Sequence, residues 1–145
     1  METNGVKNKK HFQILYGLFL TGCMESEWHD ASNNWSRTYN SQKPDSVRLV
    51  HSHYWQSGHC TLEYSFHFES APNEDLENGL IKRNELLQQT QNSPQPSFYG
   101  INTPEWFAPK DERYYSIWIP KETTHNFTLL IDVETQHLFW TETQL

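Results

Sequence analysis

The chain has 145 residues, which is enough for one domain. Hydrophobic residues make up 35% of it and aromatic residues 14%, so Trp, Tyr and Phe have to supply much of the core and disorder of the whole chain is not expected. The formal charge is −7, from 11 basic and 18 acidic side chains. This acidic balance argues against nucleic acid as a partner, because binding to phosphates depends on Lys and Arg.

The N-terminal segment has the order of parts that is typical of a secretory signal. Three lysines, at 7, 9 and 10, precede a ten-residue apolar stretch at 11–20 that is too short to cross a bilayer as a helix. The next residues, Leu20-Thr21-Gly22-Cys23, resemble the lipobox of bacterial lipoproteins, in which a signal peptidase cuts before the cysteine. The resemblance covers residues 1–23 alone. A buried strand or helix is the alternative interpretation of the same apolar stretch.

The resemblance implies that residues 1–22 are removed and that Cys23 becomes a lipidated N-terminal residue. More than one acyl chain would give lasting membrane attachment. Met24 is not the aspartate that typically retains such proteins in the inner membrane, so the resemblance implies an outer-membrane protein facing the periplasm of a Gram-negative cell. Cleavage would leave 8 basic and 17 acidic side chains, a charge of −9 over 123 residues.

Residues 23–46 are polar and are predicted to form the tether between the lipid anchor and a single domain at 47–145. Three aromatic residues, Trp28, Trp35 and Tyr39, follow one another at spacings of seven and four. On a helix they would lie in one narrow stripe. We therefore expect a short helix here that docks its aromatic side chains on the domain.

Residues 47–69 predict an antiparallel hairpin, because their second half alternates strictly between apolar and polar residues. A reversal at Ser57-Gly58 would place Trp55 opposite Cys60 and Val47 opposite Phe68. In that register His51 and His53 share the apolar face of the hairpin.

The rest of the chain predicts one helix followed by three strands. The helix is expected from Asn73, a suitable N-cap, to Gln89. Residues 91–112 contain four prolines and are predicted to form a long irregular connection. Strands are expected at 114–120, 126–132 and 137–143. The order ββαβββ predicts an α+β fold with a single antiparallel sheet of about five strands and one main helix on one face.

Two groups of side chains are candidates for chemistry. His51, His53 and Cys60 would lie on one face of the hairpin and are of the types that bind Zn or Cu, although their spacing matches no known ligand pattern. The opposite face would carry the residue types of a hydrolytic triad, namely Ser52, Glu63, Ser65 and His67. The chain has no Gly-x-Ser-x-Gly motif and no Gly-rich phosphate loop. We therefore predict no catalytic residue, no metal and no cofactor.

The function expected from these features is that of a non-enzymatic, lipid-anchored envelope protein whose domain binds another protein. Its acidic charge favours a basic partner, and a concrete form of the hypothesis is an immunity-type or inhibitor-type protein. An envelope-assembly or structural lipoprotein fits the same features. A small metal-binding protein or hydrolase that uses His51, His53 and Cys60 is the alternative of a different class.

Overall fold

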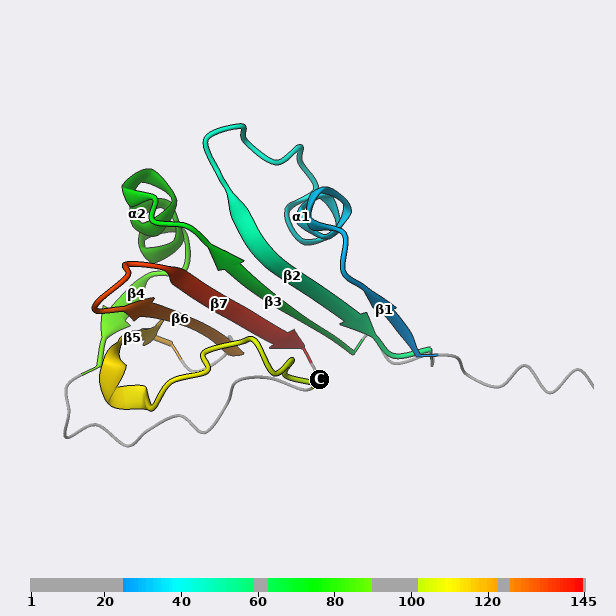
Figure 1. Ribbon diagram of the computed structural model, residues 1–145. Coiled ribbons are helices and arrows are strands. Elements are labelled where there is room, and N and C mark those ends of the chain that lie inside the picture. The colour runs from blue at the N-terminus through cyan, green and yellow to red at the C-terminus, as the bar shows by residue number, and fades with distance from the viewer. Residues whose placement is uncertain (1–24, 59–62, 90–101, 123–125, 145) are drawn as a thin grey trace, which may run out of the picture.

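A computed structural model of the chain describes residues 25–58, 63–89, 102–122 and 126–144 (Figure 1). In order, the elements are β1 (Ser26–Trp28), α1 (Ala31–Tyr39), β2 (Leu49–Gln56), β3 (Tyr64–Ser70), α2 (Glu74–Arg83), β4 (Leu86–Gln88), the 3-10 turn η1 (Glu112–Tyr114), β5 (Tyr115–Pro120), β6 (Asn126–Asp132) and β7 (Leu138–Gln144). The fold is thus α+β with an antiparallel sheet, as predicted. The expected strand number was wrong, because the described residues form seven strands in one sheet.

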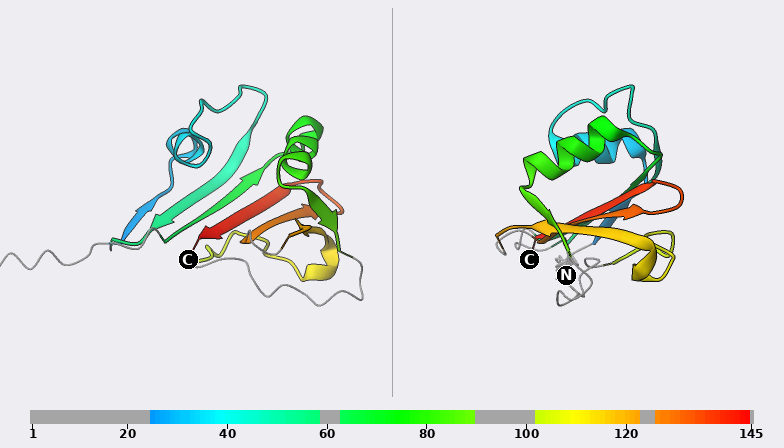
Figure 2. Two further views of the ribbon diagram at one scale, coloured as in Figure 1. Left: turned by 180° about the vertical axis from the view of Figure 1, so that it is seen from behind. Right: turned by 90° about the vertical axis from the view of Figure 1, so that its left-hand side faces the viewer.

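The strand order β1-β2-β3-β7-β6-β5-β4 joins two meanders. The first is β1-β2-β3, the second is β4-β5-β6-β7, and the last strand of each pairs with that of the other. Both helices lie on one face of the sheet, and the segment from residue 102 to η1 runs along the opposite face (Figures 1 and 2). The helical layer therefore contains α1 as well as the expected α2.

The predicted tether contributes a strand and a helix to this fold. β1 pairs with β2, so that Trp28 lies opposite Tyr54 in the sheet and not on a helix. α1 begins after Asp30, whose side chain accepts a hydrogen bond from the Asn33 N–H at 2.7 Å. Trp35 and Tyr39 of α1 do pack on the domain, as expected from their spacing.

α2 begins where the sequence predicted and ends earlier. The Asn73 side chain accepts from the Leu76 N–H at 2.8 Å, and three acidic residues occupy the first turn. The helix ends at Arg83, because Glu85 has a positive φ of 49° and cannot continue it. Leu86 then enters the sheet opposite Pro120, and only 5% of its surface is exposed. Of the residues after Arg83 that were expected to be helical, Leu86–Gln88 form the edge strand β4.

The predicted hairpin exists, but its register was wrong. Trp55 pairs with Ser65, and Phe68 pairs with Ser52 and not with Val47. The Ser57 N–H donates to the Glu63 carbonyl at 3.0 Å beyond the Gln56–Tyr64 pair, so the chain does not reverse at Ser57-Gly58 as expected. The partner of Trp55 is Ser65 instead of the expected Cys60, a shift of five positions in register. Because an odd displacement moves side chains to the other face of a sheet, His51 and His53 lie on the face away from Phe66 and Phe68.

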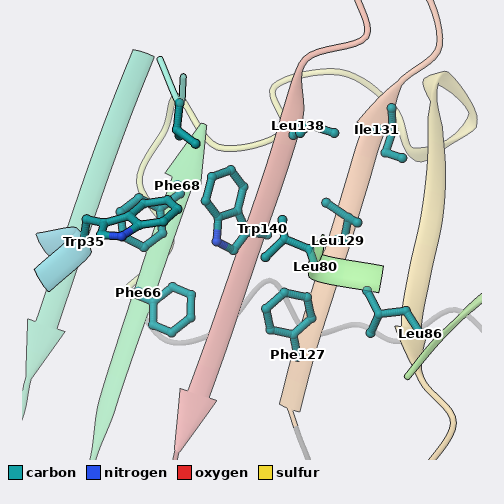
Figure 3. Close-up of a cluster of buried hydrophobic side chains, with 11 residues drawn as sticks. Trp35, Phe66, Phe68, Leu80, Leu86, Phe127, Leu129, Ile131, Leu138 and Trp140 are labelled. Atoms are coloured by element: carbon teal, nitrogen blue, oxygen red, sulfur yellow. The ribbon is translucent and has the colours of Figure 1, made fainter. Parts of the chain in front are cut away.

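The main core lies between the sheet and the helices. Trp35 of α1 packs edge-on to Phe68, and Phe68 stacks on Trp140 with ring centroids 5.1 Å apart (Figure 3). Leu80 of α2 joins the same cluster. A smaller core on the opposite face consists of Phe107, Tyr115, Ile117, Leu130 and Phe139. Both faces of the central strands are therefore covered.

Candidate functional site: a pocket between the two helices

A pocket of about 300 Å³ opens on the helical face of the sheet. Its walls come from the end of α1 and the end of α2, and its floor comes from β2, β3, β6 and β7. It is lined by Arg37, Thr38, Tyr39, Tyr54, Tyr64, Phe66, Arg83, Asn84, Phe127 and Glu142. Aromatic rings combined with a few polar groups are typical of ligand sites, and this volume is at the small end of their range.

The two guanidinium groups of the pocket are each stacked on an aromatic ring. Arg37 lies over the Trp28 ring, 4.4 Å from its centroid, and also donates to Asn34 Oδ1 at 3.1 Å. Arg83 lies over the Tyr39 ring at 5.1 Å. Within the described residues, neither arginine forms an ion pair with a carboxylate. Stacking limits the freedom of both guanidinium groups, and the N–H donors that are not bonded to Asn34 remain available to a ligand.

Tyr39 is held in place by the core. Its hydroxyl accepts a hydrogen bond of 2.7 Å from Trp140 Nε1, and its ring stacks on Phe68. Burial raises the pKa of the Tyr39 phenol, against the smaller opposing effects of the Trp140 hydrogen bond and the Arg83 charge. Since this ring carries Arg83, the position of that guanidinium is tied to the central strand β7.

The floor of the pocket holds one carboxylate among phenols. Tyr64 donates to Glu142 Oε1 at 2.9 Å, and the Tyr54 and Tyr64 rings are nearly parallel, with centroids 6.0 Å apart. Burial and the neighbouring Glu142 charge raise the pKa of Tyr64, and burial raises that of Tyr54. Both phenols are therefore neutral at physiological pH, whereas Glu142 provides an acceptor at the floor.

An apolar pocket of about 320 Å³ adjoins the first one. Tyr39 and Arg83 line both pockets, so this stacked pair stands between them. Apart from that pair, the apolar pocket is lined by Trp35, Ser41, Pro44, Ser46, Val47, Asn73, Asp75, Leu76, Gly79 and Leu80. The two pockets lie side by side between α1 and α2, one with two guanidinium groups and the other apolar, and we refer to the pair as the groove.

The sequence did not predict this site. Its side chains come from both helices and from four strands, and they meet only because the two meanders join in one sheet. The spacing of Trp35 and Tyr39 was the one local signal, and it indicated packing. Arg37 and Arg83 have no pattern around them that distinguishes them from other surface cations.

The histidines singled out in the sequence lie on the other face of the sheet. His53 and His67 face each other across β2 and β3, with Nδ1 atoms 3.4 Å apart and both side chains buried. Phe107 packs edge-on to His67, and His29 stacks on His53. Burial lowers the pKa of His53, which the Glu27 charge partly offsets and the His29 charge reinforces.

His51 belongs to a second group on that face. Its Nε2 atom is 3.9 Å from the buried Glu69, which also accepts a 2.7 Å hydrogen bond from His137 Nδ1. The His51 ring stacks on Trp106. Among the described residues, no three His, Cys, Asp or Glu side chains are placed to hold a metal ion. Cys60 and Cys23 lie outside the described residues.

The hydrolytic candidates are divided between the two faces of the sheet. Ser52 faces the helical layer, where its hydroxyl accepts from Asn34 Nδ2 and donates to the His29 carbonyl. Ser65 and His67 point to the opposite face, because their pairing partners in β2 are Trp55 and His53. Glu63 precedes β3 and lies next to Tyr64 in the sequence. A triad needs hydrogen-bond contact between nucleophile and base, and the sheet separates Ser52 from His67.

Comparison with protein-family models, curated protein sequences and solved structures found no match to this chain. Among the described helices, none is long and apolar enough to pass through a membrane.

Proposed function

We propose that this chain is a lipid-anchored protein of the bacterial envelope that has no enzymatic activity and binds another protein through the groove between α1 and α2. The observation that carries the proposal is the composition of this groove. Three tyrosines and two stacked arginines surround one pocket on the helical face. Tyr and Arg are enriched among the residues that dominate the energy of protein interfaces.

The surface charge supports a basic partner. Residues 23–145 contain 17 acidic and 8 basic side chains. Most of these carboxylates are exposed, including Glu74 and Asp75 in the first turn of α2. A negative field of this kind accelerates encounter with a positively charged protein and orients it. An immunity-type or inhibitor-type protein that blocks a basic toxin or hydrolase in the periplasm is the concrete form of this proposal, and an envelope-assembly protein is its alternative.

The N-terminal sequence supports the location. Lys7, Lys9 and Lys10, the apolar stretch and Leu20-Thr21-Gly22-Cys23 are the parts of a lipoprotein signal, and Met24 favours sorting to the outer membrane. The Cys23→Ala variant of the full chain tests the anchor. It should incorporate no labelled fatty acid and should leave the membrane fraction, whereas undiminished labelling would exclude Cys23 as the lipidated residue.

Capture of the partner tests the binding surface. The full chain, extracted in mild detergent, serves as bait for envelope and secreted proteins. The Arg37→Glu/Arg83→Glu variant should lose the captured protein. The matched control, Arg48→Glu/Arg113→Glu, has the same change of charge at exposed positions outside both pockets and should keep it. If both variants lose the captured protein equally, the effect is one of charge alone. If both retain it equally, the groove is excluded as the binding surface.

A further inference from the structure

We infer that the pocket between α1 and α2 captures the C-terminal carboxylate of the partner protein, and that the adjoining apolar pocket takes the partner's last side chain. This inference rests on the proposed function, since it names the part of the partner that the groove would bind. It is argued from the two arginines, the acceptors at the floor and the boundary that the two pockets share at Tyr39 and Arg83.

The arginines supply the recognition of a carboxylate. Guanidinium groups bind carboxylates through parallel N–H···O hydrogen bonds, and here one group stands on each helical wall. Elsewhere in the described structure, Lys110 is bound to Asp132 and Glu134, and Arg113 to Asp111. Arg37 and Arg83 have aromatic rings in place of such partners. Each is therefore oriented before a ligand arrives, which reduces the entropy lost on binding.

The floor distinguishes a peptide terminus from a simple anion. Glu142 lies in the same pocket as the two arginines and would repel a multiply charged ligand such as phosphate. A peptide terminus carries one negative charge and, in the same residue, a backbone N–H donor. Glu142 and the Asn84 side-chain carbonyl are acceptors for such a donor. Capture of a terminal carboxylate is a known mode of peptide recognition.

The apolar pocket fits the side chain of that last residue. It begins on the far side of the Tyr39–Arg83 pair, so a residue held at Arg83 can extend its side chain towards Val47 and Leu80. The pocket also has free space beside α2, because a Cβ atom added at Gly79 would meet nothing within 4 Å. A volume of about 320 Å³ accommodates one large apolar side chain.

A C-terminal ligand is compatible with a basic partner. Every unmodified protein chain ends in a carboxylate, whatever its net charge. The acidic surface can therefore attract the body of a basic partner while the arginines bind its terminus. A ligand that was acidic throughout would be repelled by the 17 carboxylates.

The test uses labelled hexapeptides with two lysines near the N-terminus and Leu, Phe or Ser as the last residue. Each peptide is made with a free carboxylate and with a C-terminal amide, and binding to the full chain in detergent is followed by fluorescence anisotropy. The free acids ending in Leu or Phe should bind at least tenfold more tightly than their amides and than the acid ending in Ser. Equal binding of acid and amide, or no binding of any peptide, would overturn the inference.

Variants assign the effect to the two pockets. Arg37→Gln and Arg83→Gln should each weaken the binding of the free-acid peptides at least tenfold. They should also reduce the difference in affinity between acid and amide. Lys82→Gln is the matched control for Arg83→Gln, since it removes one charge from α2 at an exposed position outside the pockets. It should change binding less than twofold. Gly79→Phe should weaken only the peptides that end in Leu or Phe.

The outcomes separate this inference from the proposed function. If the acid and amide peptides bind alike while the Arg37→Glu/Arg83→Glu variant still loses its captured protein, the groove binds a protein but not a chain terminus. If the capture is also indifferent to these arginines, both proposals fail.

Discussion

Trp140 Nε1 donates a 2.7 Å hydrogen bond to the hydroxyl of Tyr39 and so joins the last residue of α1 to the central strand β7. The Trp140 side chain has no exposed surface. Its N–H group has therefore exchanged water for a single protein partner, and the stability of the fold depends on that partner.

We expect Tyr39→Phe to lower the free energy of unfolding by about 1–3 kcal/mol, because it leaves the buried Trp140 N–H without an acceptor. The aromatic ring under Arg83 is retained, so the groove should still bind its ligand. Urea unfolding followed by tryptophan fluorescence measures the loss. Tyr114→Phe, at an exposed residue, is the control. Equal stability of the two variants would contradict this role of Tyr39.

Asp132 should stabilise the fold at neutral pH and lose this effect in acid. Burial alone would raise the pKa of its carboxyl, but hydrogen bonds from Lys110 and from the N–H groups of Thr135 and Glu134 outweigh burial and lower the pKa to about 2. A lowered carboxyl pKa stabilises the fold above the unfolded value of about 3.9. That contribution is lost as the pH falls from there through about 2.

Asp132→Asn should therefore cost about 1–2 kcal/mol at neutral pH. It should also flatten the decline in stability between pH 4 and pH 2. Urea midpoints at a series of pH values measure both effects. Asp111→Asn, whose carboxylate is largely exposed, should change neither. An unchanged acid profile in Asp132→Asn would show that other carboxyls dominate acid unfolding.

His53 should make the fold less stable below neutral pH. Its folded-state pKa is lowered by burial, so the unfolded chain binds a proton at a pH where the folded chain does not. The fold therefore has its full stability above the unfolded-state pKa of about 6.5, and it loses stability as the pH falls from there towards the lower folded-state pKa of His53. His53→Gln should lose less stability than the wild type between pH 7.5 and 5.5. Parallel profiles would exclude His53 as the source.

Gly79→Ala should stabilise the protein by about 0.5–1 kcal/mol, because Gly in a helix interior retains more freedom in the unfolded chain than Ala does. Gly79 lies inside α2, is exposed, and leaves open space where the Cβ atom would be. Thermal or urea unfolding measures the gain. A loss of stability would mean that α2 needs a glycine here for its backbone.

Local patterns predicted the elements better than their assembly. The alternation of Phe127, Leu129 and Ile131 gave the bounds of β6, and the capping ability of Asn73 gave the start of α2. These signals come from neighbouring residues. The end of α2 was not predicted because Leu86 pairs with Pro120 of β5, which is distant in the sequence. Burial in the tertiary structure overrides helix propensity there.

The register of β2 and β3 shows why the candidate residues were misplaced. A reversal at Ser57-Gly58 agreed with the alternation in both strands, but the alternation also fits other registers. The observed pairing of His53 with His67 puts both imidazoles on the face away from the helices. His53 and His67 therefore lie together, although the sequence patterns assigned them to opposite faces of the hairpin.

The place of β7 in the sheet has a consequence for the life of the chain before it folds. β7 lies between β3 and β6, in the middle of the sheet, so β3 and β6 each lack one neighbour until Leu138–Gln144 has been synthesised. A chain still attached to the ribosome exposes the open edge of β3 and the apolar rings of Phe66 and Phe68. An open strand edge beside exposed apolar rings favours aggregation, and pairing with β7 removes this hazard.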